Sequence, residues 1–421
     1  MKEKTGNTIK LIALTALLGA FAGAVIWIFL RLAGICTGLI WEGIPEMTGF
    51  SFMPAFFATA GGLLVGVLHK RFGDYPEELD TVMARIRKDK YYDYHPVPVM
   101  LACAFIPLIS GASVGPEAGL TGIIAALCYW IGDNVTFAKK NTELFSEIGE
   151  AVTLSQLFHS PLFGIIAVEE AEEDGKEDGL KLSSGNKLLF YGISTAVGFI
   201  AALALSRIFG SAMEGMPSFS EAAMGKTDLL MLLAYIPAGL LLYLLFELCE
   251  KLTRALAGRI PGVLRETVCG AFAGLVGVLL PLAMFSGEEQ MGELIGSFAS
   301  YSPLFLLGVC AVKLFMTAFC IRLGMKGGHF FPLIFACCCM GFALSGFFFP
   351  TDPGSHAAVA AAAVAGTVLG AQLKKPIVAS LLLLLCFPAK ILFLIFLCAA
   401  VGKSAAEAVE RRAGAGKKEA A

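Results

Sequence analysis

The sequence predicts an all-α, multi-span membrane protein built from two inverted-topology repeats with broken and re-entrant helices. Three observations support this prediction: an apolar composition, uncharged segments long enough to cross a bilayer, and local features that recur at one sequence offset. Of the 421 residues, 57% are hydrophobic and 16% are charged, whereas ordinary globular chains carry about 25% charged residues. The formal net charge of -2 leaves no net basic field to recruit nucleic acid. Soluble enzymes, nucleic-acid binders and disordered scaffolds are therefore excluded as classes.

Uncharged segments of about 18 or more residues can cross about 30 Å of hydrocarbon as helices. This length is met by residues 11–30, 51–68, 188–206, 229–246, 267–287 and 294–312. Shorter or interrupted apolar segments cover residues 97–116, 118–132, 151–168, 327–350, 357–373 and 376–400. We expect several members of this second group not to span as simple helices.

Basic residues mark the cytoplasmic side. They gather before residue 11, in the 70–96 loop and after residue 410, so the positive-inside rule places both termini and this loop in the cytoplasm of a cell-membrane protein. The first apolar segment has no small-residue cleavage signal and is interpreted as a first helix. We expect a first membrane repeat over 1–208, a connecting segment over 209–228, a second repeat over 229–402 and a short cytoplasmic tail over 403–421, with no regulatory domain after it.

Three local features recur at nearly one sequence offset. A glycine before an apolar stretch recurs at positions 73 and 287, a glycine-rich turn at 115 and 328, and a proline opening an apolar run at 161 and 376, which are offsets of 214, 213 and 215. Secondary transporters and related channels use internal repeats with helices broken in matching places to build a mid-membrane site at the repeat interface. We therefore expect the functional site at the breaks.

The first turn, residues 111–119, reads Gly-Ala-Ser-Val-Gly-Pro-Glu-Ala-Gly between two apolar segments. An intramembrane carboxylate costs about 2.5 to 3.5 kcal/mol on insertion scales and is a functional candidate by default. Glu117 follows a proline, which favours the first turn of a helix, where free N–H groups and the helix dipole favour negative charge. Backbone groups of Gly115, Ala118 and Gly119 would then bind an anion. We expect Glu117 to be both gate and proton acceptor; the alternative is a capping acid at the membrane surface.

The second turn, residues 324–332, reads Gly-Met-Lys-Gly-Gly-His-Phe-Phe-Pro one repeat offset later. It predicts a second helix N-terminus aimed at the same point from the other half. Gly328, His329 and Phe330 would bind the anion through backbone N–H groups. The His329 side chain is interpreted as packed rather than as a proton carrier, although histidine titrates near neutrality.

These residues resemble those of the CLC chloride channels and chloride-proton antiporters. The first turn is similar to the family motif G-x-S-x-G-R-E-G-P, with Glu117 at the gating glutamate, and the second to G-G-x-F-x-P, with Phe330 and Pro332 in place. Residues 158–170 resemble F-N-A-P-L-A-G-x-x-F-x-x-E-E. The resemblance runs from about residue 11 to 401. It implies a homodimer with one pore per subunit that moves chloride or a similar small anion, as a channel or with proton coupling.

The chain departs from the family pattern at several positions. Pro116 stands in place of the arginine before the gating acid, which removes a charge and a backbone donor. The family's serine loop, G-S-G-I-P, is matched only by residues 72–76, so Gly73 and Asp74 are the candidate anion loop. The third motif puts Glu170 on the family's first inner glutamate and Ala171 on the second, which is the internal proton station of antiporters. Passive conduction and exchange both stay open.

One alternative belongs to another class of protein. Residues 111–115 spell G-x-S-x-G, the nucleophile pattern of serine hydrolases, so an intramembrane hydrolase with Ser113 as nucleophile and His159 or His329 as base is the second hypothesis. That pattern requires a strand–turn–helix elbow and ordered partners, and no segment here alternates as a strand.

Cysteines and lysines inside apolar stretches have simple interpretations. The 12 cysteines include no C-x-x-C pair, so we expect apolar filler, with no metal site and no cofactor. Lys313, Lys374, Lys375 and Lys390 interrupt the second half, and we expect them to snorkel toward the cytoplasmic interface, with the lining of an anion vestibule as the alternative.

Overall fold

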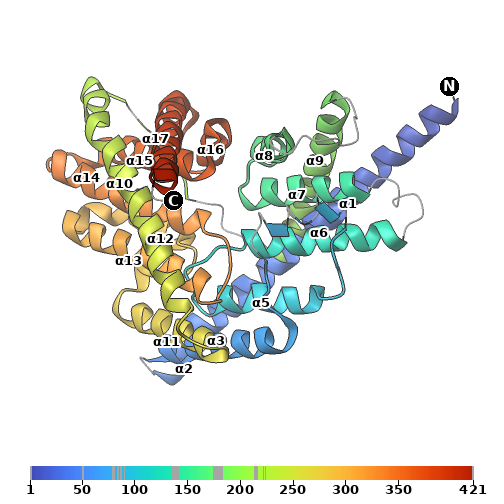
Figure 1. The fold of residues 1–421 in the computed structure, drawn as a ribbon, viewed down its shortest axis with the longest axis horizontal. Coiled ribbons are helices and arrows are strands. Elements are labelled where there is room, and N and C mark those ends of the chain that lie inside the picture. Colours follow the sequence, from blue (N-terminus) through green and yellow to red (C-terminus); the bar gives the residue numbers. More distant parts are fainter. Residues whose placement is uncertain are drawn as a thin grey trace.

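The computed structural model describes residues 2–49, 52–77, 81–82, 85, 88–89, 91–134, 142–173, 184–212, 217–220, 222 and 224–419. These residues are almost entirely helical (Figure 1). Eight helices in the described part of the chain are long and apolar enough to cross a membrane. The predicted all-α membrane fold is therefore confirmed.

The first half of the chain contains α1 to α9. Its helices are α1 (Lys2–Gly38), the π-helical turn η1 (Leu39–Gly43), α2 (Ile44–Thr48), α3 (Met53–Phe72), α5 (Val97–Ile109), α6 (Glu117–Asn134), α7 (Thr142–Leu157), α8 (Pro161–Glu173) and α9 (Ser184–Phe209).

The second half contains α10 to α17 and several short 3-10 turns. Its elements are α10 (Lys226–Ala257), α11 (Val263–Leu279), η3 (Pro281–Ala283), α12 (Glu288–Ser297), η4 (Phe298–Ser300), α13 (Pro303–Arg322), α14 (Phe330–Phe348), α15 (Pro353–Leu373), α16 (Pro376–Leu383), η5 (Ala389–Ile391) and α17 (Leu392–Glu419). The predicted connecting segment falls largely between α9 and α10, while α17 continues through the predicted tail. The repeat boundaries themselves stay predictions.

Two of the predicted spans have different limits in the structure. The segment 294–312 is not one helix, because α12 ends at Ser297 and α13 begins at Pro303. The hydroxyl of Ser302 accepts a hydrogen bond from the N–H of Phe305 at 3.2 Å, which caps α13. The segment 267–287 is also shorter than expected, since α11 ends at Leu279, before a 3-10 turn. Uniform hydropathy conceals such breaks, because a serine or proline hardly changes the average.

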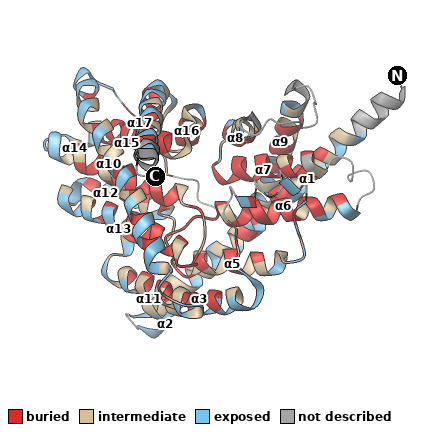
Figure 2. Cartoon of the chain, in the orientation of Figure 1, coloured by how far each residue is buried: buried red, intermediate tan, exposed pale blue. Residues whose placement is uncertain are grey.

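Two other segments are more regular than expected. Residues 327–350 and 357–373 contain α14 and α15, and both helices are long enough to span. They form the buried centre of the second half, where nearly every side chain of α15 from Ala357 to Ala371 is shielded (Figure 2). The small side chains of α15 allow neighbouring helices to approach it closely, so the helix is densely packed.

The halves are joined where α3 packs against α11 (Figure 1). A methyl group at Gly62 would collide with the backbone carbonyl of Glu266, and one at Gly270 with that of Ala58. Both glycines therefore allow close backbone contact between the two helices. This contact fixes the relative position of segments that precede the two glycine-rich turns.

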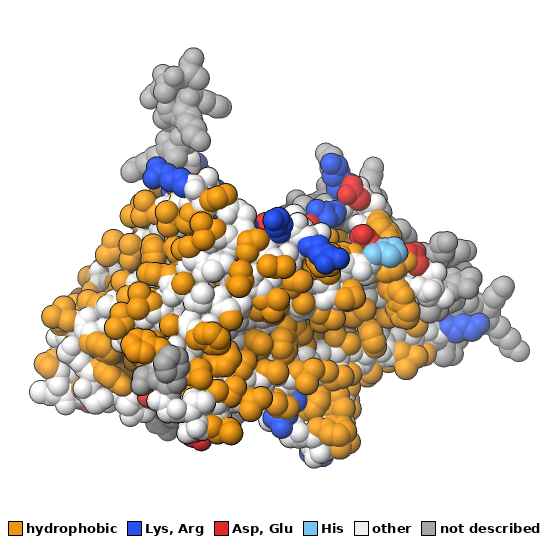
Figure 3. Space-filling model, turned by 90° about the horizontal axis from the view of Figure 1, so that it is seen from below, with side chains coloured by type: hydrophobic (Ala, Val, Ile, Leu, Met, Phe, Trp, Pro, Cys, Tyr) orange, Lys and Arg blue, Asp and Glu red, His pale blue; other side chains and the backbone are white. Residues whose placement is uncertain are grey.

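Hydrophobic side chains cover much of the face shown in Figure 3. Leu233 and Phe393 are each 77% exposed, and Leu304 is 71% exposed. A soluble protein would bury such side chains, whereas hydrocarbon is a favourable solvent for them. The surface thus agrees with the membrane location that the composition predicts.

Candidate functional site

The two glycine-rich turns meet in the structure and pair through their backbones. The N–H of Gly115 donates to the carbonyl of Gly328 at 2.7 Å, and the N–H of Gly328 donates to the carbonyl of Gly115 at 2.7 Å. This reciprocal pair joins residues separated by one repeat offset. The turns were expected to converge from the two halves, and they are in direct contact.

Glu117 lies beside this glycine pair. It is the first residue of α6 and is only 2% exposed. Its Oε1 accepts a hydrogen bond from the N–H of Phe331 at 3.4 Å, and the N–H of Phe330 also faces the carboxylate. Its Oε2 has no hydrogen-bond partner among the described residues. The side chain is therefore a buried acid at the positive end of α14, where its ionised form would be favoured by the helix dipole.

The glycines form the wall against which the carboxylate lies. A methyl group on Gly115 or on Gly328 would overlap Oε2 of Glu117. No other residue type leaves room for a carboxylate at this position, because every other side chain begins with a Cβ atom. Glycine is thus required at these two positions because a Cβ atom would overlap the carboxylate, and not because of the backbone dihedral angles.

The backbone N–H groups at the start of α14 have different partners. We predicted that those of Gly328, His329 and Phe330 would bind the anion. The N–H of Gly328 is used in the glycine pair, and those of Phe330 and Phe331 face Glu117, so anion binding by these residues stays a prediction. His329 is the N-cap residue of α14, and its carbonyl accepts from the N–H of Leu333 at 3.0 Å. The His329 ring stacks on Phe246, with ring centroids 6.1 Å apart. This agrees with its interpretation as a packed side chain.

Ala118 and Gly119 lie in the first turn of α6. Gly119 is buried, and a methyl group added to it would collide with that of Ala104, while Ala118 is half-buried. The hydroxyl of Thr121 donates to the carbonyl of Glu117 at 2.7 Å, which strengthens the same turn. Anion contact through Ala118 and Gly119 stays a prediction.

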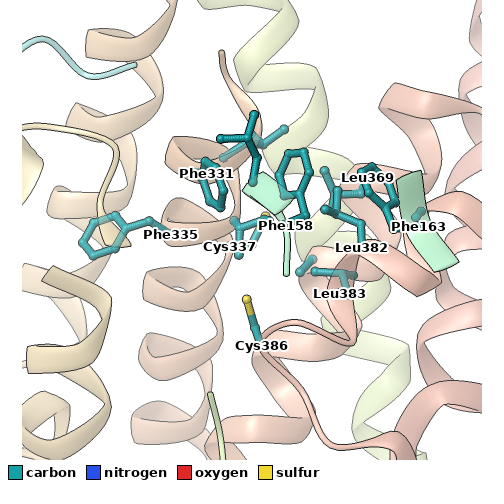
Figure 4. Close-up of a cluster of buried hydrophobic side chains, with 14 of the residues drawn as sticks. Phe158, Phe163, Phe331, Phe335, Cys337, Leu369, Leu382, Leu383 and Cys386 are labelled. Carbon is teal, nitrogen blue, oxygen red and sulfur yellow. The ribbon is translucent and has the colours of Figure 1, made fainter. Parts of the chain in front are cut away.

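The third motif also reaches the site. Phe158 stacks on Phe331 with ring centroids 4.9 Å apart, and it contacts Phe330 and Phe163 edge-on. Figure 4 shows Phe158 and Phe331 side by side within the buried apolar cluster. The start of α14 is therefore held by a residue from the first half. All three motifs of the sequence meet within one region.

The candidate anion loop contacts the second turn through a salt bridge. Gly73 ends α3 with a φ of 108°, and the Asp74 carboxylate lies 2.9 Å from Nζ of Lys326. Burial alone would raise the pKa of Asp74, but Lys326, His69 and Arg265 outweigh it, so its pKa is lowered. The ionised carboxylate is half-exposed and paired with cations. Binding of an anion by Gly73 and Asp74 stays a prediction.

The candidate inner acid lies near the end of α8. Glu170 is in the last turn of α8 and is half-buried. The structure brings Glu117, Gly115, Gly328 and Phe330 together, whereas Glu170 lies on another helix. Its role stays a prediction.

Ser113 is not placed as a hydrolase nucleophile. It is fully buried, and its Oγ lies 3.0 Å from Oγ1 of Thr317, which is neither a base nor an acid. His159 is exposed at a helix end with a φ of 45°, and the His329 ring stacks on Phe246. The hydrogen bond to Thr317 instead anchors the first turn to α13. The structure gives the hydrolase alternative no support.

One buried group was not expected at the site. We predicted that Lys313 would snorkel to the interface, but its side chain is fully buried in α13. This prediction was wrong, whereas Lys374 is partly exposed and its Nζ lies 2.7 Å from the carboxylate of Glu410. A single lysine in a 20-residue apolar helix is the sequence signal that could have indicated a buried charge.

Comparison with known proteins agrees with this geometry. The family model described as "Voltage gated chloride channel" matches residues 61–407. The protein YfeO of Escherichia fergusonii, provisionally named an ion-transport protein, is 22% identical over 356 residues, which are 82% of this chain and 81% of YfeO.

Solved structures share the fold. A slow cyanobacterial Cl−/H+ antiporter matches with a TM-score of 0.76 and 18% identity over 94% of each chain. A CLC-type fluoride/proton antiporter matches with a TM-score of 0.68 and 19% identity over 94% of this chain and 95% of its own. Since the family model covers most of the sequence, the chain belongs to the voltage-gated chloride channel family.

Proposed function

We propose that this protein moves chloride or a similar small anion across the membrane through a site gated by Glu117. Membership of the family supports anion transport. The observation that carries the site assignment is the buried carboxylate of Glu117, which lies against the glycine pair at the N-terminus of α14. A carboxylate in that position occupies the anion-binding site that a helix N-terminus provides.

The proposed gating follows from competition for the same donors. The ionised carboxylate is stabilised by the N–H of Phe331 and by the dipole of α14. A permeant anion would take the same groups, and the wall of Gly115 and Gly328 would let it approach the backbone closely. Protonation removes the charge of Glu117 and with it the main attraction to α14. Anions and protons would therefore both release the gate.

The chemical class of the substrate is a small monovalent anion. The structural relatives comprise a Cl−/H+ antiporter and a fluoride/proton antiporter, and backbone amides bind either halide through the same N–H groups. Ala171 stands where the family places its internal proton acid, so we propose proton movement that is weak or absent relative to anion movement. The half-buried Glu170 beside it is the remaining candidate for an inner acid.

The test is transport by the purified protein in liposomes. Vesicles loaded with chloride or fluoride are diluted into anion-poor buffer, and efflux is followed with an ion-selective electrode while a trapped dye reports internal pH. We expect halide efflux that needs the protein and a valinomycin-mediated potassium path. Halide efflux equal to that of empty liposomes would overturn the proposed function. Strong proton uptake that persists when the membrane potential is clamped at zero would instead establish tight coupling, because only the halide gradient could then drive it.

We also propose the assembly and orientation that the family resemblance implies. Each subunit of a homodimer would carry its own pore, in the cell membrane, with both termini in the cytoplasm. Mass measurement of the detergent-solubilised protein tests the dimer, and a monomeric mass would reject it. A fluorescent protein fused to the C-terminus tests the orientation, because it would fluoresce only in the cytoplasm.

A further inference from the structure

A groove of about 300 Å³ lies between α10 and α13, and we call it the α10–α13 groove. The residues that line it are Leu252, Thr253, Ala255, Leu256, Arg259 and Phe315. Thr253 is buried, and its hydroxyl donates to the carbonyl of Cys249 at 2.7 Å, so it is already satisfied. The guanidinium of Arg259 is therefore the polar group that the groove offers to a ligand.

The groove is open on the outer surface of the protein. Leu252 is 56% exposed and Leu256 is 39% exposed. With Arg259 they are spaced four and three residues apart, so all three follow one face of the helix and the turn after it. At 1.5 Å per residue, Leu252 lies about 8 Å from the end of α10 at Ala257. An apolar groove with a cation at one end matches a molecule with an apolar chain and an anionic head.

Contacts of the next helix place Arg259 relative to the membrane. Helix α11 begins at Val263, four residues after Arg259. A methyl group on Gly66 of α3 would lie 3.0 Å from the Cα of Val263, and Nη2 of Arg265 lies 3.9 Å from the Asp74 carboxylate. The end of α10 is thus on the same side as the 70–96 loop, which is predicted to be cytoplasmic. Anionic lipids give the cytoplasmic leaflet a negative surface, which attracts basic residues.

The positive charge at this end of α10 is not neutralised by the described acids. Lys251, Arg254 and Arg259 are exposed, and none of them has a salt bridge within the described part of the chain. The acid next to Lys251 in the sequence is Glu250, and both of its carboxylate oxygens lie 3.0 Å from Nη2 of Arg322. An unpaired guanidinium is well suited to bind a phosphate group through two N–H donors.

We propose that the α10–α13 groove binds an anionic phospholipid, with one acyl chain along Leu252, Leu256 and Phe315 and the phosphate group at Arg259. Cavities of about 150 Å³ hold a benzene-sized molecule, so this groove has room for a longer stretch of one chain. Basic residues also stabilise the C-terminal end of a helix, but that role would not depend on the groove. The inference goes beyond the proposed function and is tested without any measurement of transport.

The experiment is native mass spectrometry of the purified, delipidated protein during titration with a defined lipid. Phosphatidylglycerol is the anionic lipid, and phosphatidylcholine is the zwitterionic one. Arg259→Gln removes the charge, whereas Ala255→Phe fills the groove without changing the charge. Arg71→Gln is the matched control, because Arg71 is an exposed arginine at the end of α3, on the same side, and does not line the groove. Size-exclusion chromatography in detergent verifies that each variant is folded.

We expect the wild-type protein to bind phosphatidylglycerol more tightly than phosphatidylcholine. Arg259→Gln should weaken binding of phosphatidylglycerol about fivefold, which corresponds to about 1 kcal/mol for one basic residue near an anionic headgroup. It should leave binding of phosphatidylcholine unchanged. Ala255→Phe should weaken binding of both lipids, because the ring occupies the space of the acyl chain. Arg71→Gln should match the wild-type protein.

Three results would overturn the inference. The first is equal affinity of the wild-type protein for the two lipids, and the second is an equal effect of Arg259→Gln and Arg71→Gln. The third is a change from dimeric to monomeric mass in Ala255→Phe with unchanged lipid affinity, which would show that a second copy of the chain fills the groove. If Ala255→Phe does not fold, the comparison of the two arginine variants decides.

Discussion

Replacement of Glu117 by glutamine tests the gate most directly. The substitution keeps the size of a side chain that is 2% exposed and that accepts a hydrogen bond from Phe331. A hydrogen bond to a charged group contributes about 1.5 to 3 kcal/mol, and one between neutral groups about 0.5 to 1.5. The glutamine therefore competes less well with the anion by about 1 to 1.5 kcal/mol. This difference corresponds to about a five- to tenfold increase in anion flux near neutral pH.

The same substitution removes the titrating group. In the wild-type protein, lowering the pH protonates Glu117, neutralises the gate and increases flux. In Glu117→Gln, flux should be high and independent of pH. The assay is initial chloride efflux from proteoliposomes at several pH values, with internal pH recorded in parallel. Any proton movement coupled to chloride should also disappear in the variant.

The control for this experiment is Glu46→Gln, which neutralises an exposed acid on α2. It should retain wild-type flux and wild-type pH dependence. The reasoning would be refuted if Glu117→Gln kept the full pH dependence of the wild-type protein. It would also be refuted if both variants changed flux equally, because the effect would then come from surface charge.

Three further predictions concern neighbouring residues. Gly328→Ala places a methyl group where the Glu117 carboxylate lies, so it should make flux less dependent on pH in the same efflux assay. Gly308→Ala is the control, because the new Cβ has open space around it, and it should behave as wild type. Equal behaviour of the two variants would contradict the contact between Gly328 and the carboxylate. Ser113→Ala loses a buried hydrogen bond to α13 and should lower the free energy of unfolding by about 1 kcal/mol. The measurement is the midpoint of thermal unfolding, which should fall. An esterase or protease activity that the wild-type protein has and this variant lacks would revive the hydrolase hypothesis. Asp74 has a lowered pKa in the folded protein, so its ionised form stabilises the fold above about pH 4 and this contribution is lost as the pH falls through the lower folded value. Asp74→Asn should therefore flatten the pH dependence of the unfolding midpoint below about pH 5, and an unchanged pH profile would contradict the salt-bridge assignment.

Much of the fold could be predicted because hydropathy and repeat offset are local properties of the chain. Three predicted spans fall within α1, α9 and α10, and most of a fourth, 51–68, lies in α3. The offset between residues 115 and 328 correctly identified two turns that pair. The errors have a physical cause. The break between α12 and α13 lies in a segment of even hydropathy, where a serine cap and a proline decide the helix limit. Conversely, α14 and α15 are buried as full helices despite many small residues.

At the site, the residue types in the sequence predicted which residues come together, but not which atoms contact one another. Glu117 was identified because a carboxylate inside hydrocarbon is costly and is therefore a functional candidate. The glycines were identified because a Cβ atom would prevent an ion from approaching the backbone closely. The hydrogen bond from the N–H of Phe331 to Glu117 was not expected beside Phe330, because the direction of each N–H group at a helix start depends on how the helix is placed in the fold. Whether Asp74 and Glu170 act on the anion was also beyond the sequence, since it depends on distances between helices.

The sequence by itself determined that the chain belongs in a membrane, that its halves correspond, and that one acid lies at a broken helix. These conclusions follow from charge, apolar length and spacing, which need no knowledge of neighbours. Only the tertiary structure decided that Ser113 pairs with Thr317, that Phe331 faces the carboxylate, and that Lys313 remains buried instead of reaching the interface. Such partners lie up to 214 residues away in the chain, and packing of the two halves alone brings them within bonding distance.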